Sequence, residues 1–391
     1  MQNDIQNTNK KSTFKKTLVA MVITGLVLLL IGGGIFVGGL GLVEWNIFNL
    51  DPEIITQAEG FSSTEEVTHL SLTGSWNYEI VQGEYFSVQY FTSSNSTTTT
   101  DLHRNANDNT YKFVLHETRR QTFFNIGFGG LRRARNHYTV RITVANDIDT
   151  IHITGSSARV HIADLDINFR NIRVDGSSTR LYLNNVNLNH AQNTSIQVSG
   201  SAARVTLTNT QAESVSVTGS STEAILQNVN IANTLSLAGS AVRATLTNTQ
   251  AESVSALGSS ARIILQNTTI AGTLSVEGSA ARATLTDSTV REATLLGSSS
   301  RLDAHNSHLR NASVVGSAAR ADLHIIGNVT DVHTLSASGS NNRLYFNGTR
   351  QHNEFRPNAG QPVGAQGFMN FSTLGSNARL DVTMLGGESV F

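Results

Sequence analysis

Arginine is the residue type whose spacing most clearly suggests chemistry in this sequence. A five-residue phrase, Gly-Ser-(Ser/Ala)-Ala-Arg, occurs at 155–159, and ten of its eleven exact or looser copies end in arginine. These arginines are Arg159, Arg180, Arg204, Arg243, Arg262, Arg282, Arg301, Arg320, Arg343 and Arg379. Guanidinium groups in a row can bind a repeating polyanion, such as a wall teichoic acid or an acidic glycan. They can equally cover edge carbonyls and keep a protein face soluble, and the sequence leaves both interpretations open.

Other reactive residues lack the partners that catalysis or metal binding needs. The sequence has no cysteine, and it contains no GxSxG, HExxH, P-loop or Cys/His zinc pattern. His305 and His308 have a spacing seen in metal sites, but no further ligand recurs at a fixed offset, so we interpret them as solvated turn residues. A net charge of −1 argues against nucleic-acid binding. We therefore predict a non-enzymatic protein without a cofactor or metal.

The arginines belong to a repeat whose period predicts the fold. Between Gly200 and Gly316 the phrase returns every 19 or 20 residues, and short strands of alternating polarity flank it. A unit of this length, rich in Gly, Ser and Thr, cannot form a pair of helices. We therefore predict an all-β fold, a parallel β-solenoid of about 20 residues per coil whose coils stack about 4.8 Å apart.

A second column of residues predicts one corner of each coil. Asn or Asp stands two positions after an apolar residue in most copies, at Asp164, Asn185, Asn209, Asn228, Asn248, Asn267, Asp287 and Asn306. Both residue types tolerate a left-handed backbone, and stacked amides can bond to one another. We expect the recurring glycine to serve the same backbone role at another corner. Counting back from an inward Leu207 places Val205 inside and Arg204 outside.

The chain before the repeats divides into a membrane anchor and an irregular region. Residues 17–43 carry no charge over 27 positions, follow four lysines and precede several acidic residues. This pattern predicts one uncleaved membrane-spanning helix, with the N-terminus in the cytoplasm and the rest of the chain outside the cell membrane. The predicted parts are a cytoplasmic segment at 1–16, the span at 17–43, a linker at 44–67, an irregular β region at 68–150 that caps the solenoid, and repeats at 151–391 with a loop insertion at 347–370.

A basic and aromatic segment at 119–135 interrupts the irregular region. Its candidate contact residues are Arg119, Arg120, Phe123, Phe124, Phe128, Arg132, Arg133 and Arg135. One interpretation is a loop that touches the anionic membrane surface or an anionic wall polymer. The alternative is a long hairpin whose apolar residues close the end of the core, since a solenoid needs such a cover.

Several of these features together resemble a known bacterial family. They are the basic N-terminus, the Gly-rich span, the exit Trp45-Asn46-Ile47-Phe48, the strand ending Thr73-Gly74-Ser75, the strand at 138–145 and the Gly-Ser-containing coils. The chain resembles membrane-anchored proteins that carry the putative-adhesin domain of unknown function, related to the head domain of autotransporter-type adhesins. This resemblance implies a right-handed solenoid and a role at the cell surface or envelope. Some family members are encoded near envelope-stress signalling systems.

Three functions follow as alternatives. The first is a membrane-anchored surface protein that displays a rigid β-solenoid for adhesion or for contact with an anionic wall polymer or glycan. The second is an envelope-stress accessory protein that binds a membrane sensor protein, through the anchor or the segment at 119–135. The third and most remote is a polysaccharide lyase, which would need clustered acidic and basic residues in a groove.

Overall fold

The structure is a computed structural model that describes residues 55–63, 67–93, 96–105, 109–119, 139–145, 147–165, 169–186, 194–356, 369–388 and 390. Nearly all of them belong to one compact unit, formed by 57–92, 98–118 and 137–391. A second unit, formed by 1–56, 93–97 and 119–136, contributes only a few strand ends to the described residues. The predicted span at 17–43 lies outside them. Within the part that is described, no helix is long and apolar enough to cross a membrane.

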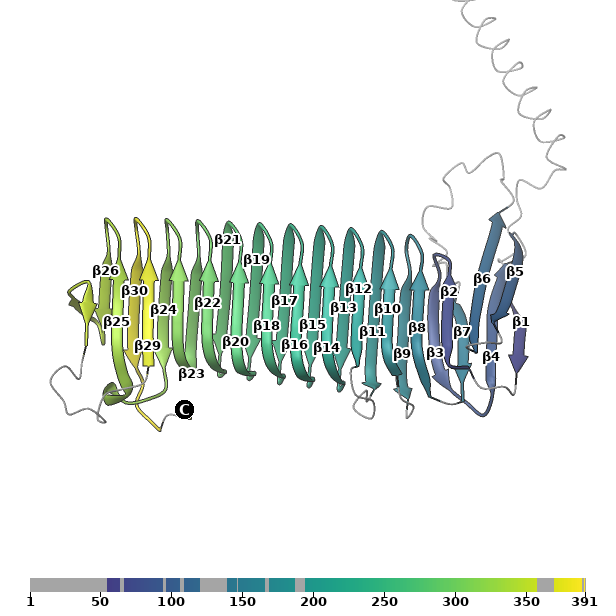
Figure 1. The fold of residues 1–391 in the computed structure, drawn as a ribbon, viewed down its shortest axis with the longest axis horizontal. Helices are drawn as coiled ribbons and strands as arrows, with labels where there is room; N and C mark the ends of the chain where they lie inside the picture. The colour runs from purple at the N-terminus through teal and green to yellow at the C-terminus, as the bar shows by residue number, and fades with distance from the viewer. Residues whose placement is uncertain are drawn as a thin grey trace, which may run out of the picture. The chain divides into compact units, whose positions relative to one another are not determined.

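Two sheets, here called sheet A and sheet B, run along the main unit and face each other (Figure 1). In spatial order, sheet A contains β4 (Phe86–Ser93), β7 (Thr139–Val144), β3 (Asn77–Gln82), β9 (Arg159–Leu165), β11 (Ser178–Val186), β13 (Ala202–Thr208), β15 (Ser221–Gln227), β17 (Ala241–Thr247), β19 (Ser260–Gln266), β21 (Ala280–Thr286), the first part of β23 (Arg301–Val315), β24 (Arg320–Ile325), β30 (Arg379–Met384), β26 (Arg343–Phe346) and β27 (Thr349–Gln351).

Sheet B consists of the strands that alternate with these along the chain. In spatial order they are β6 (Thr110–Arg119), β2 (His69–Thr73), β8 (Ile148–Thr154), β10 (Phe169–Asp175), β12 (Ser195–Ser199), β14 (Gln211–Thr218), β16 (Asn230–Ala238), β18 (Gln250–Leu257), β20 (Thr269–Glu277), β22 (Thr289–Leu296), the last part of β23, β29 (Met369–Leu374), β25 (Val332–Ser338) and β28 (Glu354–Phe355). The remaining described elements are β1 (Ile55–Ser63), β5 (Ser96–Asn105) and the 3-10 turn η2 (Val329–Asp331).

Each coil contributes one strand to each sheet, and the apolar residues of both strands meet between the sheets. In β13, Val205 and Leu207 are fully buried, whereas Arg204 points outward as predicted. In β14 the buried residues are Val215 and Val217. Because strands of successive coils pair in parallel and nearly in register, the same residue position stays buried from coil to coil. The predicted all-β parallel solenoid of about 20 residues per coil is thus confirmed.

The corner after each sheet A strand is built by the Asn/Asp column, as the sequence predicted. All eight residues of that column adopt a left-handed backbone, with φ between 48° and 55°. Their side chains also form a ladder, in which each amide donates to the corner residue of the preceding coil. The bonds run from Asn185 to Asp164 at 2.6 Å and continue through Asn209, Asn228, Asn248 and Asn267 at 2.8–3.1 Å.

The amide ladder is interrupted at Asp287, and this gives a first testable prediction. The carboxylate of Asp287 accepts a hydrogen bond from the amide of Asn306 at 2.6 Å. It has no hydrogen to donate to Asn267. Replacing Asp287→Asn should restore the missing bond and raise the free energy of unfolding by about 0.5–1 kcal/mol in urea titrations. Asp164→Asn, at the start of the ladder, is the control and should give no such gain. A loss of stability in the Asp287→Asn variant would contradict this account.

The glycine column has a different role from the one predicted. We expected glycine for its left-handed backbone, but most of these residues, Gly297 among them, lie outside that region. What requires glycine is the close approach of successive coils. A Cβ added at Gly219 would lie 1.8 Å from the carbonyl oxygen of Gly200, and one at Gly297 would lie 1.7 Å from that of Gly278. No side chain fits between the coils at this corner.

The order of the coils in space differs from their order in the chain at both ends. Near the C-terminus, β30 pairs with β24 on one side and β26 on the other, and β29 lies between β23 and β25 (Figure 1). The coil that comes last in the chain, formed by β29 and β30, therefore lies between the two coils that precede it in the sequence. Near the N-terminus, β2 likewise lies between β6 and β8, and β3 lies between β7 and β9. The outermost coil at each end is thus an internal segment of the chain.

Two short strands lie within the predicted insertion at 347–370. Residues 349–351 form β27, which pairs antiparallel with β26, and Glu354–Phe355 form β28, which pairs antiparallel with β25. The ring of Phe355 packs 5.4 Å from that of Phe346. These two short strands therefore cover the outermost coil of this end, which β25 and β26 form.

Candidate polyanion surface

The arginines of the repeat form one continuous ladder on the outer face of sheet A. In spatial order the register joins Arg159, Arg180, Arg204, Glu223, Arg243, Arg262, Arg282, Arg301, Arg320, Arg379 and Arg343 as direct neighbours. We call this row the arginine ladder. It passes through the intercalated last coil without a break, since Arg379 lies between Arg320 and Arg343. Adjacent members are therefore about one coil apart, roughly 4.8 Å at their Cα atoms.

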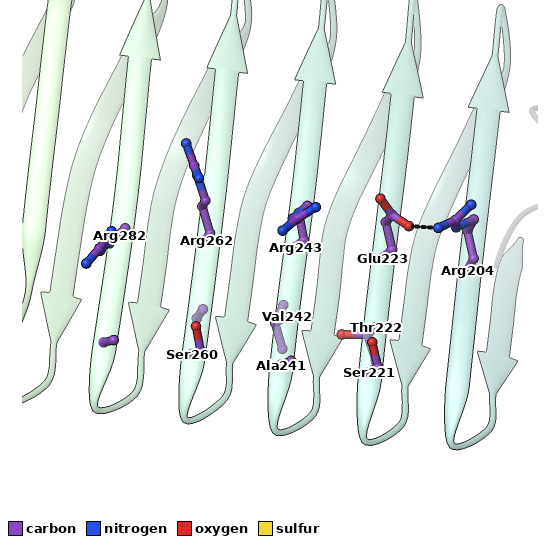
Figure 2. A pocket seen from close by; sticks show the side chains of 12 residues that line it. Arg204, Ser221, Thr222, Glu223, Ala241, Val242, Arg243, Ser260, Arg262 and Arg282 are labelled. Atoms are coloured by element: carbon purple, nitrogen blue, oxygen red, sulfur yellow. Dashed lines mark ion pairs between the residues drawn. The ribbon is translucent and has the colours of Figure 1, made fainter.

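The one acidic member neutralises its neighbour. Glu223 forms an ion pair with Arg204, drawn as a dashed line in Figure 2. The side chains of Arg204 and Glu223 are 42% and 24% exposed, so solvent weakens the pair. Arg204 therefore adds little to the positive potential of the ladder.

Two of the ladder arginines beyond Arg282 also pair with acidic neighbours. Arg301 pairs with Asp303 at 2.7 Å, and Arg379 pairs with Asp381 at 3.1 Å. In both cases the acid lies two positions later on the same strand, where side chains project from the same face. These pairs cancel part of the charge in the C-terminal half of the ladder.

Three consecutive arginines between these regions keep their full charge. Arg243, Arg262 and Arg282 are exposed, and none of them pairs with a carboxylate within the part of the chain that the structure describes. The neighbours on the same strand and the same face are all neutral. They are Thr245, Ile264 and Thr284 two positions later, and Ala241, Ser260 and Ala280 two positions earlier.

The three arginines line a shallow groove that we call the central groove. Its volume is about 540 Å³, and its lining also includes Arg204, Glu223 and small side chains such as Ser260 (Figure 2). Adjacent guanidinium groups repel each other by at most roughly 1 kcal/mol in water. A bound polyanion would remove that repulsion and supply acceptors for groups that now face solvent.

The N-terminal part of the ladder carries a neutral ring stack beside it. His161 stacks on Tyr182, with ring centroids 4.4 Å apart. Burial lowers the pKa of His161, Arg159 lowers it further, and Glu79 opposes the shift. The lowered pKa of His161 favours its neutral form, so it adds little charge to the ladder there.

Of the other sequence candidates, the structure describes fully only the two histidines. The segment with Arg120, Phe123, Phe124, Phe128, Arg132, Arg133 and Arg135 lies outside the described residues, and of Arg119 the structure gives only its position at the end of β6. His305 stacks on His324 at 5.3 Å, and His308 lies on the sheet B part of β23. The described residues contain no group of three or more His, Cys, Asp or Glu arranged to hold a metal.

Comparison with known proteins defines the class to which this solenoid belongs. The profile of the Toastrack DUF4097 family matches residues 67–332, which is more than half of the chain. The chain therefore belongs to the Toastrack DUF4097 family, and the predicted family resemblance is confirmed.

A solved structure of low sequence identity also matches the chain. The crystal structure of a putative cell adhesion protein from Clostridium sporogenes ATCC 15579 matches with 8% identity and a TM-score of 0.19, covering 85% of this chain and 100% of that one. No curated protein matches the sequence.

Proposed function

We propose that this protein is a non-enzymatic surface protein whose rigid solenoid presents the arginine ladder to an anionic envelope polymer, such as a wall teichoic acid or an acidic glycan. The observation that carries the proposal is the run of Arg243, Arg262 and Arg282, which are exposed, lie in register on neighbouring strands and have no carboxylate partner among the residues that the structure describes. A polymer with regularly spaced anionic groups can contact all three at once. Each single contact is weak in water, but contacts along one polymer add through effective concentration.

The location that we propose rests on the sequence. We propose that residues 17–43 anchor the chain by one membrane-spanning helix, with the short basic N-terminus in the cytoplasm and the solenoid outside. The family resemblance favours a right-handed solenoid. Contact with a membrane protein partner through the anchor or the segment at 119–135 remains the alternative proposal.

The experiment is a binding titration of the full chain in a mild non-ionic detergent against polyphosphate and polygalacturonate. The variant Arg243→Gln/Arg262→Gln/Arg282→Gln removes the three unpaired charges. At about 1 kcal/mol for each charge, we expect roughly a hundredfold weaker binding.

A matched variant controls for net charge. Arg170, Arg291 and Arg310 all lie on sheet B strands, so replacing these three with Gln changes the net charge equally but leaves the ladder intact. We expect this variant to bind within a few fold of the unchanged protein. Equal losses in the two triple variants would mean that binding follows net charge alone, and the proposed surface would be wrong.

A further inference from the structure

Four arginines meet at the C-terminal end of sheet A. Arg320 on β24, Arg379 on β30 and Arg343 on β26 are successive ladder members, and Arg350 on β27 joins them. Together they line a second pocket of about 710 Å³, here called the end pocket. The pocket depends on the intercalated last coil, because only that coil places Arg379 between the other two.

Arg350 reaches the pocket because of the hairpin formed by β26 and β27. Arg350 lies directly opposite Tyr345 in this antiparallel pair, so both side chains project from the same face. Tyr345 follows Arg343 by two positions and shares its outward face. The hairpin thus adds a guanidinium group from outside the repeat, which no periodicity in the sequence predicts.

The end pocket holds more positive charge than its acidic neighbours balance. Asp381 pairs with Arg379, while Arg343 and Arg350 are exposed and have no carboxylate partner among the described residues. Asp322, the register neighbour of Asp381 on β24, has its Oδ1 3.4 Å from Nε2 of His324. At least two guanidinium groups therefore remain uncompensated within one pocket.

The pocket also has hydrogen-bonding groups without partners. The Nε atoms of Arg320 and Arg379 are buried and have no acceptor among the described residues, and the Oδ1 atom of Asn342 has no donor. The side-chain amide nitrogen of Asn342 donates to the carbonyl oxygen of Gly339 at 2.8 Å. An anion that draws the guanidinium groups of Arg320 and Arg379 toward it would supply acceptors that the described part of the chain does not offer to these Nε atoms.

We propose that the end pocket binds a compact oxyanion, the phosphoryl or carboxylate group of a small molecule. Convergent guanidinium groups bind such groups bidentately, which favours one localised anion over an extended chain. The site is distinct from the central groove, although it lies on the same ladder. It can therefore bind its ligand even if the groove binds no polymer.

The test is a calorimetric titration of the full chain with inorganic phosphate, glucose 6-phosphate and galacturonic acid in low salt. We expect binding of at least one of them, and the probe that binds identifies the source of the anion. Arg350→Gln should weaken that binding by roughly tenfold, and Arg343→Gln/Arg350→Gln should abolish it. Arg350→Lys keeps the charge but loses the planar fork, so its affinity should lie between those of the unchanged protein and Arg350→Gln.

Two controls separate this site from net charge and from the central groove. Arg356 lies near Arg350 in the chain, outside the pocket, and pairs with Glu354 at 2.7 Å, so Arg356→Gln should leave the affinity unchanged. The triple variant of the central groove should also bind the small anion normally. Failure of all three probes to bind, or an equal loss in Arg356→Gln and Arg350→Gln, would overturn the proposal.

Discussion

Replacing Gly297→Ala should lower the free energy of unfolding by roughly 3 kcal/mol or more. The added Cβ would lie 1.7 Å from the carbonyl oxygen of Gly278, and that carbonyl belongs to the backbone of the neighbouring coil. The backbone on both sides is held by ladder hydrogen bonds, such as that from Gly297 N to Val315 O at 3.0 Å. Relief of the clash therefore requires the two coils to separate, which disrupts the pairing of both sheets. Urea unfolding followed by circular dichroism measures the loss.

The same substitution at Gly348 is the matched control for this effect. Nothing lies within 4 Å of a Cβ at Gly348, although its φ of +75° disfavours alanine. Gly348→Ala should thus cost only about 1 kcal/mol, from backbone strain. If Gly297→Ala cost no more than Gly348→Ala, close coil approach would not be the reason for the glycine column.

Deleting residues 369–391 should unfold more of the protein than the deleted segment itself. This segment forms β29 and β30, which separate β23 and β24 from β25 and β26. It buries Met369, Phe371, Leu380 and Val382, at about 1.5–3 kcal/mol for each side chain. Without it, β25 and β26 lose their parallel partners. Hydrogen exchange at 332–346 should therefore become roughly a hundredfold faster, because the free energy of local opening falls in this segment.

A shorter deletion shows whether the effect belongs to the last coil. Removing 385–391 leaves β30 complete, since that strand ends at Met384. It breaks the hydrogen bonds from Leu385 N to Ile325 O and from Gly327 N to Gly386 O. Protection at 332–346 should remain almost unchanged in that variant. Full protection in the longer deletion would show that β25 and β26 pair directly with β23 and β24, contrary to the prediction.

The features that repeat in the sequence were predictable because they repeat in space. A residue that recurs once per coil must recur at one place on a parallel solenoid, so the corner at Asn228 and the outward position of Arg204 followed from spacing alone. The role of the glycines was predicted wrongly for a physical reason. Glycine serves both left-handed backbone and close contact, and the sequence does not distinguish the two.

The ends of the stack could not be predicted from the period. The coil at 369–384 carries the same phrase as the others, so its spacing is compatible with a place after or before the coil at 332–346. Pairing between segments distant in the chain decides that order. Likewise, Arg350 lies outside the repeat, and only the antiparallel pairing of β27 with β26 brings it to the end pocket.

The central claim is that Arg243, Arg262 and Arg282 act together on one polyanion, and the salt dependence of binding tests it most directly. Binding that releases counterions weakens linearly as the logarithm of salt concentration rises, with a slope set by the number of contacts. We expect the triple variant of the central groove to show a slope shallower by roughly 2 than that of the unchanged protein, as three contacts are lost. The sheet B triple variant should keep the original slope. An unchanged slope in the groove variant would contradict the claim.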